Sequence, residues 1–287
     1  MTTTLILGAG KVQSHIINAA RQLGYEVVTV DQNPDAPGHA LADHALHLST
    51  WEAGPILEAL PCEVDAVLCR SAAQPVVTAA ELCAELGLPG APVDAAEVCI
   101  RKERTMRLAD GLGLRTPGTS DKPPWVIKPN ISAGGRAGVY IVRSAAHMAE
   151  VEKYSRGASH DGYALAERYV DGEDVTLLGL VVGGEYESLA LIDETNLPDL
   201  DGSVKGLGYS YPSKYEGTAT HEALVGMAFA LQDELELVRS PLHLNARVTP
   251  DAPVLIEVHL DIGGDRLLED TLPPSATTDV VRALVEG

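Results

Sequence analysis

Cysteine is scarce in this sequence of 287 residues. The four cysteines form no CxxC pair, and a chain of this length does not need disulfide bonds to fold. We therefore expect reduced, mostly buried thiols in a cytoplasmic protein at positions Cys62, Cys69, Cys83 and Cys99. A catalytic cysteine is the alternative, but no flanking motif supports it.

Positive charge is also scarce. Lysine and arginine total 21 against 41 aspartate and glutamate residues, which gives a formal net charge of -20. Nucleic-acid binding needs a clustered basic surface, and a chain this acidic would repel the phosphate backbone. We exclude nucleic acid as a partner, and the few lysines become informative about local anion sites.

Long apolar segments are missing as well. No stretch approaches the roughly 18 consecutive apolar residues of a membrane helix. The amino terminus, MTTTLILGAG, lacks the basic start and long apolar core of a signal peptide. We expect no membrane association.

The length and composition of the chain are typical of a globular protein with about two domains. Apolar segments at 5–7, 27–30 and 66–69 alternate with helical patterns at 12–23 and 74–86. Parallel strands need crossover helices, so this order predicts a doubly wound parallel sheet of the α/β class. The turn sequence GLPGAP then ends a first domain of residues 1–92.

The remaining residues have a different pattern. We expect one helix over 95–112, a polar loop over 194–217 and a helix around 224–235. The expected strands are 125–129, 139–142, 164–169, 175–182, 188–192, 242–248 and 254–259. Little helix separates the later strands, so we interpret this part as antiparallel α+β.

The turn Gly8-Ala9-Gly10 lies between the first strand and the first helix, and Asp31 ends the next strand. This placement suits a dinucleotide, whose pyrophosphate binds helix amides and whose ribose binds the acid. However, Gln13 occupies the position of the third glycine. Two other interpretations stay open: a tight turn that needs glycine, or amides that receive a small substrate carboxylate.

Lys128, in the strand WVIKP, directly precedes the glycine-rich segment ISAGGRAGV. An ammonium group beside such a loop suits a polyphosphate, because backbone N–H groups can close over phosphate oxygens. The segment is not a Walker A loop, which would read GxxxxGK[ST]. A surface hairpin that carries a lysine by chance is the alternative.

Acidic side chains gather at two later strand ends. AERYVDGED contains Glu167 and Glu173, and IEVHLDIGGD contains Glu257 and His259 on one face of a strand. Asn245, on the preceding strand, is placed to lie opposite them. The combination suits a hard divalent cation that also binds substrate phosphates. Each acid taken alone is more typical of a solvated face.

Together these segments resemble the ATP-grasp carboxylate–amine ligases over nearly the whole chain. They occur in the family's order: LILGAG, GLPG, CIRKERTMRLADGLGLRTPG, WVIKP with the glycine loop, AERYVDGED and VLIEVHLDIGGD. The resemblance implies a pre-ATP-grasp domain with a doubly wound parallel sheet. An ATP-grasp domain of two β subdomains would follow it, the first over residues 93–170 with the phosphate loop and the second over residues 171–287 with the metal strand.

The resemblance also implies how ATP binds. Two lysines would contact the phosphates, the loop 132–138 would fold over them, and acidic and backbone groups of 167–173 would hold adenine and ribose. The expected nucleotide-binding residues are Lys102, Lys128, Ser132, Gly134, Gly135, Gly138, Glu167, Tyr169, Val170 and Glu173.

The implied cofactor is Mg²⁺, with Mn²⁺ as an alternative, and its implied ligands are Asn245, Glu257 and His259. Asn245 stands where the family has a carboxylate, and His259 stands where it has an amide. The lost charge and the imidazole favour softer ions. Asp261 stands at a family arginine and is a candidate metal carboxylate, while Arg247 and Arg266 are candidate replacements for the arginine's charge.

We predict an ATP-dependent ligase that joins a small carboxylic acid, such as an amino acid, to an amine through an acyl phosphate. The predicted catalytic residues are Lys128 and Arg247. The predicted substrate-binding residues are Gly8, Gly10, Arg70 and Tyr209, the last within the segment 205–213. A protein that binds nucleotide without turnover and an NAD-dependent oxidoreductase are the alternatives. The expected partners are small molecules, and a homodimer is left open.

Overall fold

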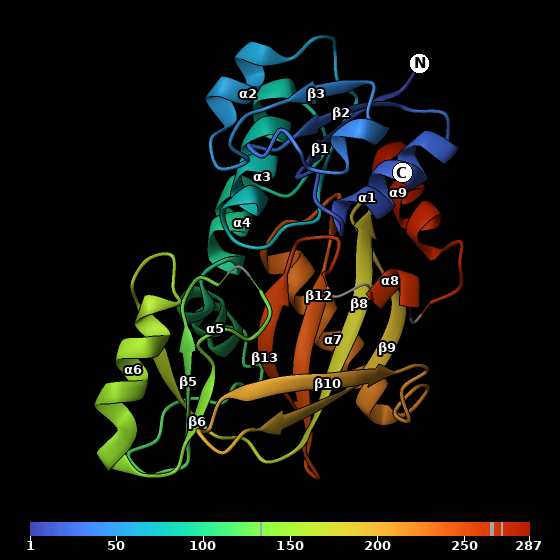
Figure 1. Cartoon of the computed structure of the whole chain (residues 1–287). Helices are drawn as coiled ribbons and strands as arrows, with labels where there is room; N and C mark the ends of the chain where they lie inside the picture. The colour runs from blue at the N-terminus through green and yellow to red at the C-terminus, as the bar shows by residue number, and fades with distance from the viewer. Residues whose placement is uncertain (133, 265–266, 271) are drawn as a thin grey trace.

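The computed structural model describes residues 1–132, 134–264, 267–270 and 272–287 and contains three β-sheets (Figure 1). The first sheet is parallel, in the order β3-β2-β1-β4. Its strands are β1 (Thr3–Leu7), β2 (Glu26–Val30), β3 (His44–Leu46) and β4 (Ala66–Cys69). The helices beside it are α1 (Gln13–Gln22), α2 (Ala53–Ala59), α3 (Gln74–Leu86) and α4 (Val93–Cys99). Buried apolar strands with crossover helices confirm the predicted α/β part.

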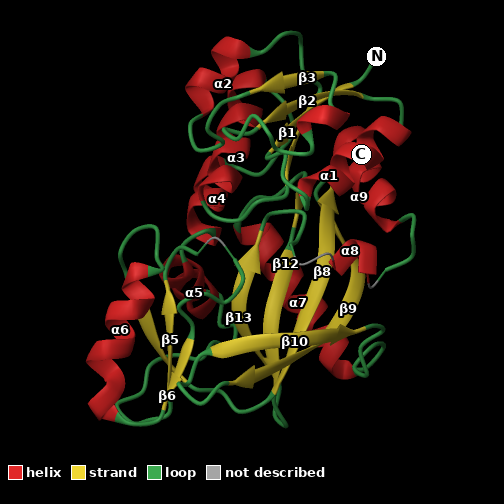
Figure 2. Ribbon diagram, in the orientation of Figure 1, coloured by secondary structure: helices red, strands yellow, loops and turns green. Residues whose placement is uncertain are grey.

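The second sheet has three antiparallel strands in the order β6-β5-β7. These are β5 (Trp125–Pro129), β6 (Tyr140–Val142) and β7 (Ala164–Arg168), with α6 (Met148–Gly157) packed against them. Trp125, Ile127, Val142 and Ala164 form a small core of their own. This separate core makes the sheet a distinct lobe, which Figure 2 shows beside the main body.

The third sheet is antiparallel, in the order β10-β9-β8-β12-β13, and the short β11 also pairs with β8. Its strands are β8 (Glu173–Val182), β9 (Glu185–Pro198), β10 (Val204–Ser210), β11 (Ser240–Pro241), β12 (His243–Val248) and β13 (Pro253–His259). The helix α7 (Ala219–Glu234) packs on it. Two further helices, α8 (Leu267–Asp270) and α9 (Ala276–Glu286), follow, and α9 lies against α1 of the first sheet.

Two expectations for secondary structure were wrong. The segment 194–217 is not a loop at its start, because β9 continues to Pro198 and β10 follows it. Polar residues on one face of these strands hid the alternation. The helix expected over 95–112 is two helices, since α5 (Lys102–Gly111) begins after a break at Arg101, whose backbone is extended.

The four cysteines are free thiols, and three of them are buried. Burial raises the pKa of Cys83 to about 11 and that of Cys99 to about 12, so neither is prepared to act as a nucleophile. Among the described residues, no helix combines the length and hydropathy that crossing a bilayer requires.

Candidate functional site

Lys102 is the first residue of α5, and a neighbouring strand end holds it in place. The amides of Lys102 and Glu103 donate hydrogen bonds to the carbonyl and side-chain oxygens of Asn130, at 3.2 and 3.0 Å. Asn130 thereby pairs two N–H groups that a helix start leaves without partners. The ammonium of Lys102 lies 2.9 Å from Ser132 Oγ and 2.7 Å from Glu257 Oε1.

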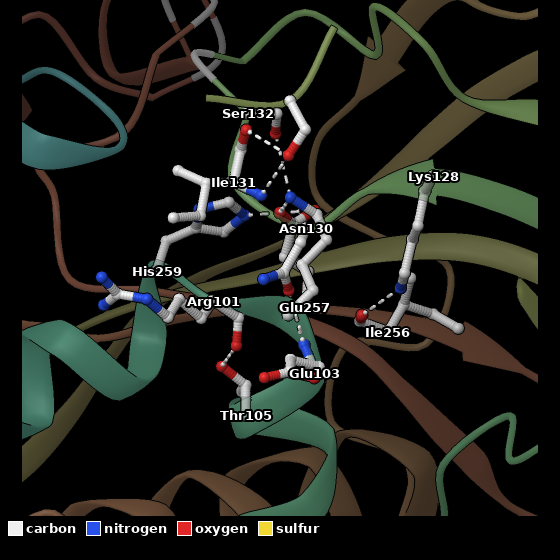
Figure 3. A network of polar contacts seen from close by, with 12 residues as sticks. Arg101, Glu103, Thr105, Lys128, Asn130, Ile131, Ser132, Ile256, Glu257 and His259 are labelled. Carbon is white, nitrogen blue, oxygen red and sulfur yellow. Dashed lines mark hydrogen bonds and ion pairs between the residues drawn. The ribbon is translucent and has the colours of Figure 1, made fainter. Parts of the chain in front are cut away.

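Lys128 reaches from β5 to the third sheet (Figure 3). Its Nζ lies 3.2 Å from the carbonyl oxygen of Ile256 on β13 and 2.8 Å from Glu167 Oε2 on β7. The side chains of Lys128 and Glu167 are 5% and 9% exposed. The second carboxylate oxygen of Glu167 is buried and lacks a hydrogen-bond partner among the described residues. A ligand N–H group would satisfy it.

Glu257 completes this cluster from β13. Burial alone would raise the pKa of Glu257, but the ammonium of Lys102 and the nearby ring of His259 outweigh burial and hold it well below its usual value. We call Lys102, Lys128, Glu167 and Glu257 the sheet junction, because they join the second sheet to the third. Two buried ammonium groups thus share one site, as an anionic polyphosphate requires.

His259 extends the junction toward the end of β13. Its Nε2 lies 3.7 Å from Glu257 Oε2, and its Nδ1 lies 3.9 Å from Asp261 Oδ2. Burial lowers the pKa of His259, but the two carboxylates outweigh this effect and raise it. The structure therefore places Glu257 and His259 together, as the sequence predicts.

Asn245, on β12, lies opposite Glu257 in the strand register. Its side-chain amide donates a 3.4 Å hydrogen bond to Glu194 Oε1 on β9. The side chain of Glu194 is 5% exposed and also pairs with Arg136 and Thr176. The sequence analysis missed this buried carboxylate beside the predicted metal ligands. Glu194 lies two residues after the buried Ile192 and thus on the same face of the strand, and this spacing is the signal that could have found it.

The glycine loop is tied to the same strands by Arg136. This residue pairs with Glu194 and hydrogen-bonds Tyr209 of β10, which stands opposite Glu194 in the register. Ser132 contacts Lys102, while the backbones of Gly134, Gly135 and Gly138 have φ angles of +96°, +74° and +80°. The first residue of the predicted phosphate loop, Ser132, therefore contacts Lys102 of the sheet junction. Ala133 of the loop lies outside the described residues.

Arg247 belongs to a different group from the junction. It forms a 2.8 Å ion pair with Asp174, donates a 2.6 Å hydrogen bond to the carbonyl of Val170, and lies 5.2 Å from the ring centre of Tyr169. The predicted adenine-binding backbone is thus held by a cation that was predicted to be catalytic. Arg266, the other cation considered, lies outside the described residues, as does Asp265 of the glycine turn.

Glu173 is the most exposed of the predicted nucleotide-binding acids, at 56%. It pairs with Lys214 and accepts a 2.9 Å hydrogen bond from the hydroxyl of Tyr215. The bonds from Lys214 and Tyr215 lower the pKa of Glu173. This carboxylate stays ionised and open to solvent.

Arg70 is buried directly after β4, where protein groups surround its guanidinium. Its Nη1 and Nη2 lie 2.6 and 2.8 Å from the two carboxylate oxygens of Glu269, and its Nε donates to the carbonyl of Gly263 at 2.9 Å. All three guanidinium nitrogens are therefore committed to protein groups. Arg70, which was predicted to bind substrate, thus joins β4 to Glu269 and Gly263 within the protein.

Gly8 and Gly10 do line a cavity, of about 340 Å³, at the carboxyl ends of the parallel strands. We call it the edge cavity, and its other lining residues are Gln13, Asp31, Gln32, Ser49, Thr50, Trp51 and Ser71. The amide of Ala9 donates a 2.9 Å hydrogen bond to Asp31. Binding sites in open α/β sheets occur at this edge.

Comparisons with known proteins agree with this architecture. No family model matches the chain. The chain is 31% identical over 196 residues to a formate-dependent phosphoribosylglycinamide formyltransferase of Burkholderia vietnamiensis, which covers 59% of the chain and 46% of the relative. The chain thus spans about half the length of the curated relatives it matches.

Two solved structures share the fold over almost the whole chain. An N5-carboxyaminoimidazole ribonucleotide synthetase in complex with ADP has a TM-score of 0.81 at 16% identity and covers 99% of this chain and 77% of its own. An L-amino acid ligase from Bacillus licheniformis has a TM-score of 0.76 at 21% identity, with coverages of 99% and 75%. These likenesses confirm the fold predicted from the sequence and agree with the resemblance to the ATP-grasp ligases.

Proposed function

We propose that this protein is an ATP-dependent ligase that joins a small carboxylic acid to an amine. The observation that carries the proposal is the sheet junction, where two buried ammonium groups and Glu257 meet between two β-sheets. Each ammonium contacts two protein partners among the described residues, one fewer than its three N–H donors. Phosphate oxygens are the ligands that such donors suit.

The residues present fit a nucleotide. Lys102, Lys128 and Ser132 would hold the phosphates, and the loop 132–138 would cover them. The partnerless oxygen of Glu167 is a buried acceptor that suits an exocyclic amino group of adenine. Bound adenine would thus give this buried oxygen a hydrogen-bond partner.

The junction also fits a divalent cation. Glu257 and the side-chain oxygen of Asn245 offer hard oxygen ligands, while His259 offers a nitrogen that softer ions accept. Because the Asn245 amide nitrogen already donates to Glu194, its oxygen is left for the ion. A bound Mg²⁺ or Mn²⁺ would supply charge neutralisation for the phosphates.

The chemistry follows from the weakness of a carboxylate as an electrophile. An oxygen of the acid takes the terminal phosphoryl group and ADP leaves, which gives an acyl phosphate. The amine nitrogen then attacks the acyl carbon, phosphate leaves, and the nitrogen loses a proton. The protein's part is to align the groups and neutralise charge, with Lys102 and Lys128 as the fixed cations. The glycine loop would exclude water from the acyl phosphate.

The named relatives support small acids and amines as substrates, since one uses formate and another ligates amino acids. The experiment that tests the proposal is substrate-dependent phosphate release, screened over pairs of small acids and amines with Mg²⁺ and with Mn²⁺. In Lys128→Met, release should fall by about 100-fold or more, because a fixed charge that stabilises the transition state is lost.

Lys128→Met also leaves Glu167 buried without its cation, which should cost about 3–5 kcal/mol of stability. The double variant Lys128→Met with Glu167→Gln removes both charges and should recover most of that stability without recovering activity. Full phosphate release by a folded Lys128→Met protein would contradict the assignment of this lysine to ATP.

A nucleotide-binding protein without turnover is the second candidate, and the amide at Asn245 favours it. An amide opposite Glu257 gives the cation one negative charge fewer than a carboxylate would. Asn245→Asp should therefore tighten Mn²⁺ binding, measured by electron paramagnetic resonance, on the order of tenfold. Asn196→Asp, which also adds a charge beside Glu194, is the matched control. Phosphate release by Asn245→Asp but not by the original protein would establish the second candidate.

A further inference from the structure

The edge cavity has the chemistry of a binding site for an uncharged or cationic polar molecule. Its walls carry the hydroxyl groups of Ser49, Thr50 and Ser71 and the amides of Gln13 and Gln32. Such groups donate and accept hydrogen bonds with hydroxyl and amino groups. The volume of about 340 Å³ is at the lower end of the roughly 300–1,000 Å³ typical of small-molecule sites.

Charge in the edge cavity is negative. Asp31 is the one charged side chain among the described lining residues, and no lysine, arginine or histidine is among them. Lys11, next to Gly10, is exposed and does not line the cavity. A phosphate group here would meet a carboxylate with no cation to offset the repulsion, whereas an ammonium group would be attracted.

Two backbone amides of the glycine turn do not point into the cavity as free donors. The amide of Gly8 donates to the carbonyl of Val30 at 2.8 Å, and that of Ala9 donates to the carboxylate of Asp31 at 2.9 Å. Phosphate sites at strand–helix turns depend on such amides pointing at the ligand. These two amides are already paired inside the protein.

Contacts extend from the cavity on two sides. Gln13 Nε2 bonds Ser71 Oγ and the carbonyl of Arg70, and Arg70 in turn bonds Gly263, shortly after β13 ends. On the other side, Trp51 makes an edge-to-face contact with His160, with ring centroids 5.0 Å apart.

The contact with His160 leads to the glycine loop. The His160 amide donates a 3.0 Å hydrogen bond to the carbonyl of Ile131, the residue before Ser132. Trp51 itself is 46% exposed and offers an aromatic face at the cavity wall. The edge cavity is thus linked through contacting residues to Gly263, after the end of β13, and to Ile131, before the phosphate loop.

We infer that the edge cavity binds the amine substrate of the ligase, as an unphosphorylated amine that carries hydroxyl groups. This inference rests on the proposed function in that the amine is called a substrate, but binding of the amine does not require turnover. Asp31 attracts the ammonium form, the hydroxyl and amide side chains bind the hydroxyl groups, and Trp51 packs on the carbon skeleton.

The test is calorimetric titration of the full chain, without ATP, with pairs of amines that differ by one phosphate. The probes are serine and O-phosphoserine, ethanolamine and O-phosphoethanolamine, and glucosamine and glucosamine 6-phosphate. We expect at least one unphosphorylated member to bind at millimolar concentration, about tenfold or more tighter than its phosphorylated counterpart.

A charge added to the wall should reverse this preference. Gln32 is exposed and lines the cavity, so Gln32→Lys should retain the fold while it favours the phosphorylated member of a pair. Gln22→Lys adds the same charge at an exposed position of α1 outside the cavity and should leave the preference unchanged. Asp31→Asn should weaken amine binding.

Three results would overturn the inference. The first is that the original protein binds a phosphorylated member, or NADH, as tightly as the unphosphorylated amines or more tightly. The second is that it binds no amine. The third is that Gln32→Lys does not shift the preference. The proposed function fails separately, if ATP neither binds nor is turned over with any pair of substrates. Amine binding without ATP binding would retain the cavity assignment alone, and the reverse would retain the ligase alone.

Discussion

Two regions of this protein bury cations, and they use them differently. At the sheet junction, Lys102 and Lys128 each pair with one carboxylate oxygen and one further oxygen. At the end of β4, Arg70 binds both oxygens of Glu269 and a backbone carbonyl. All three cations are almost completely buried.

The difference lies in the geometry of the donors. A guanidinium is planar and matches a carboxylate with two parallel bonds, so the pair with Glu269 uses its full width. An ammonium is a compact charge on a flexible stem, and a ligand oxygen can replace one of its partners without displacing the whole side chain. Burial and charge alone therefore do not identify a binding cation, whereas the arrangement of its partners does.

Glu269→Gln tests the structural half of this comparison, and we expect a large loss of stability. The side chains of Arg70 and Glu269 are 0% and 12% exposed, so removing the carboxylate charge leaves a buried guanidinium without its counterion. The free energy of unfolding at neutral pH should fall by about 3 kcal/mol. Asp279→Asn, which breaks an exposed pair with Arg282, should change it by less than about 0.5 kcal/mol.

The same variant should change the pH dependence of stability. Burial raises the pKa of Glu269, but its hydrogen bonds to Arg70 and the charge of Arg70 outweigh burial and lower it. A lowered pKa gives stability that is complete above the unfolded value of about 4.3 and is lost as the pH falls through the folded value. Urea unfolding over this acid range should show that the free energies of unfolding of Glu269→Gln and the original protein converge.

If Glu269→Gln were as stable as the original protein but altered substrate affinity, Arg70 would be available to ligands. The contrast with the junction lysines would then be wrong. We expect the opposite result, namely unchanged affinity for ATP and for amines in a less stable protein.

The sequence predicted local elements well where one pattern decided them. The strand WVIKP and the helix over 74–86 were predicted at their observed bounds, because apolar alternation and flanking proline or glycine mark both ends. Lys128 was identified because the same pattern places it before a glycine loop. These signals depend on neighbours in the chain.

What the sequence could not predict depends on partners far away in the chain. Arg70 was expected to bind substrate, since nothing near it shows that Glu269 would use its guanidinium. Glu194 was assigned to a loop, because its burial follows from pairing with Arg136 and from strands β8 and β10 on either side of β9. The start of α5 at Lys102 likewise depends on Asn130.

Glu173 tests the solvent-exposed end of the comparison, and here the expected effect on stability is the smallest. Its pair with Lys214 is 56% exposed on both sides, so Glu173→Ala should cost no more than about 0.5 kcal/mol in the free energy of unfolding. If the carboxylate holds the ribose hydroxyls, however, the Kd for ATP should rise severalfold while the melting temperature stays nearly constant. Glu187→Ala, at an exposed position near the other end of the β8–β9 pair, is the matched control and should change neither quantity. An effect on nucleotide affinity without an effect on folding would show that binding at this end relies on a carboxylate whose ion pair with Lys214 contributes little to stability. Equal ATP affinity in Glu173→Ala would instead restrict nucleotide recognition to the buried junction.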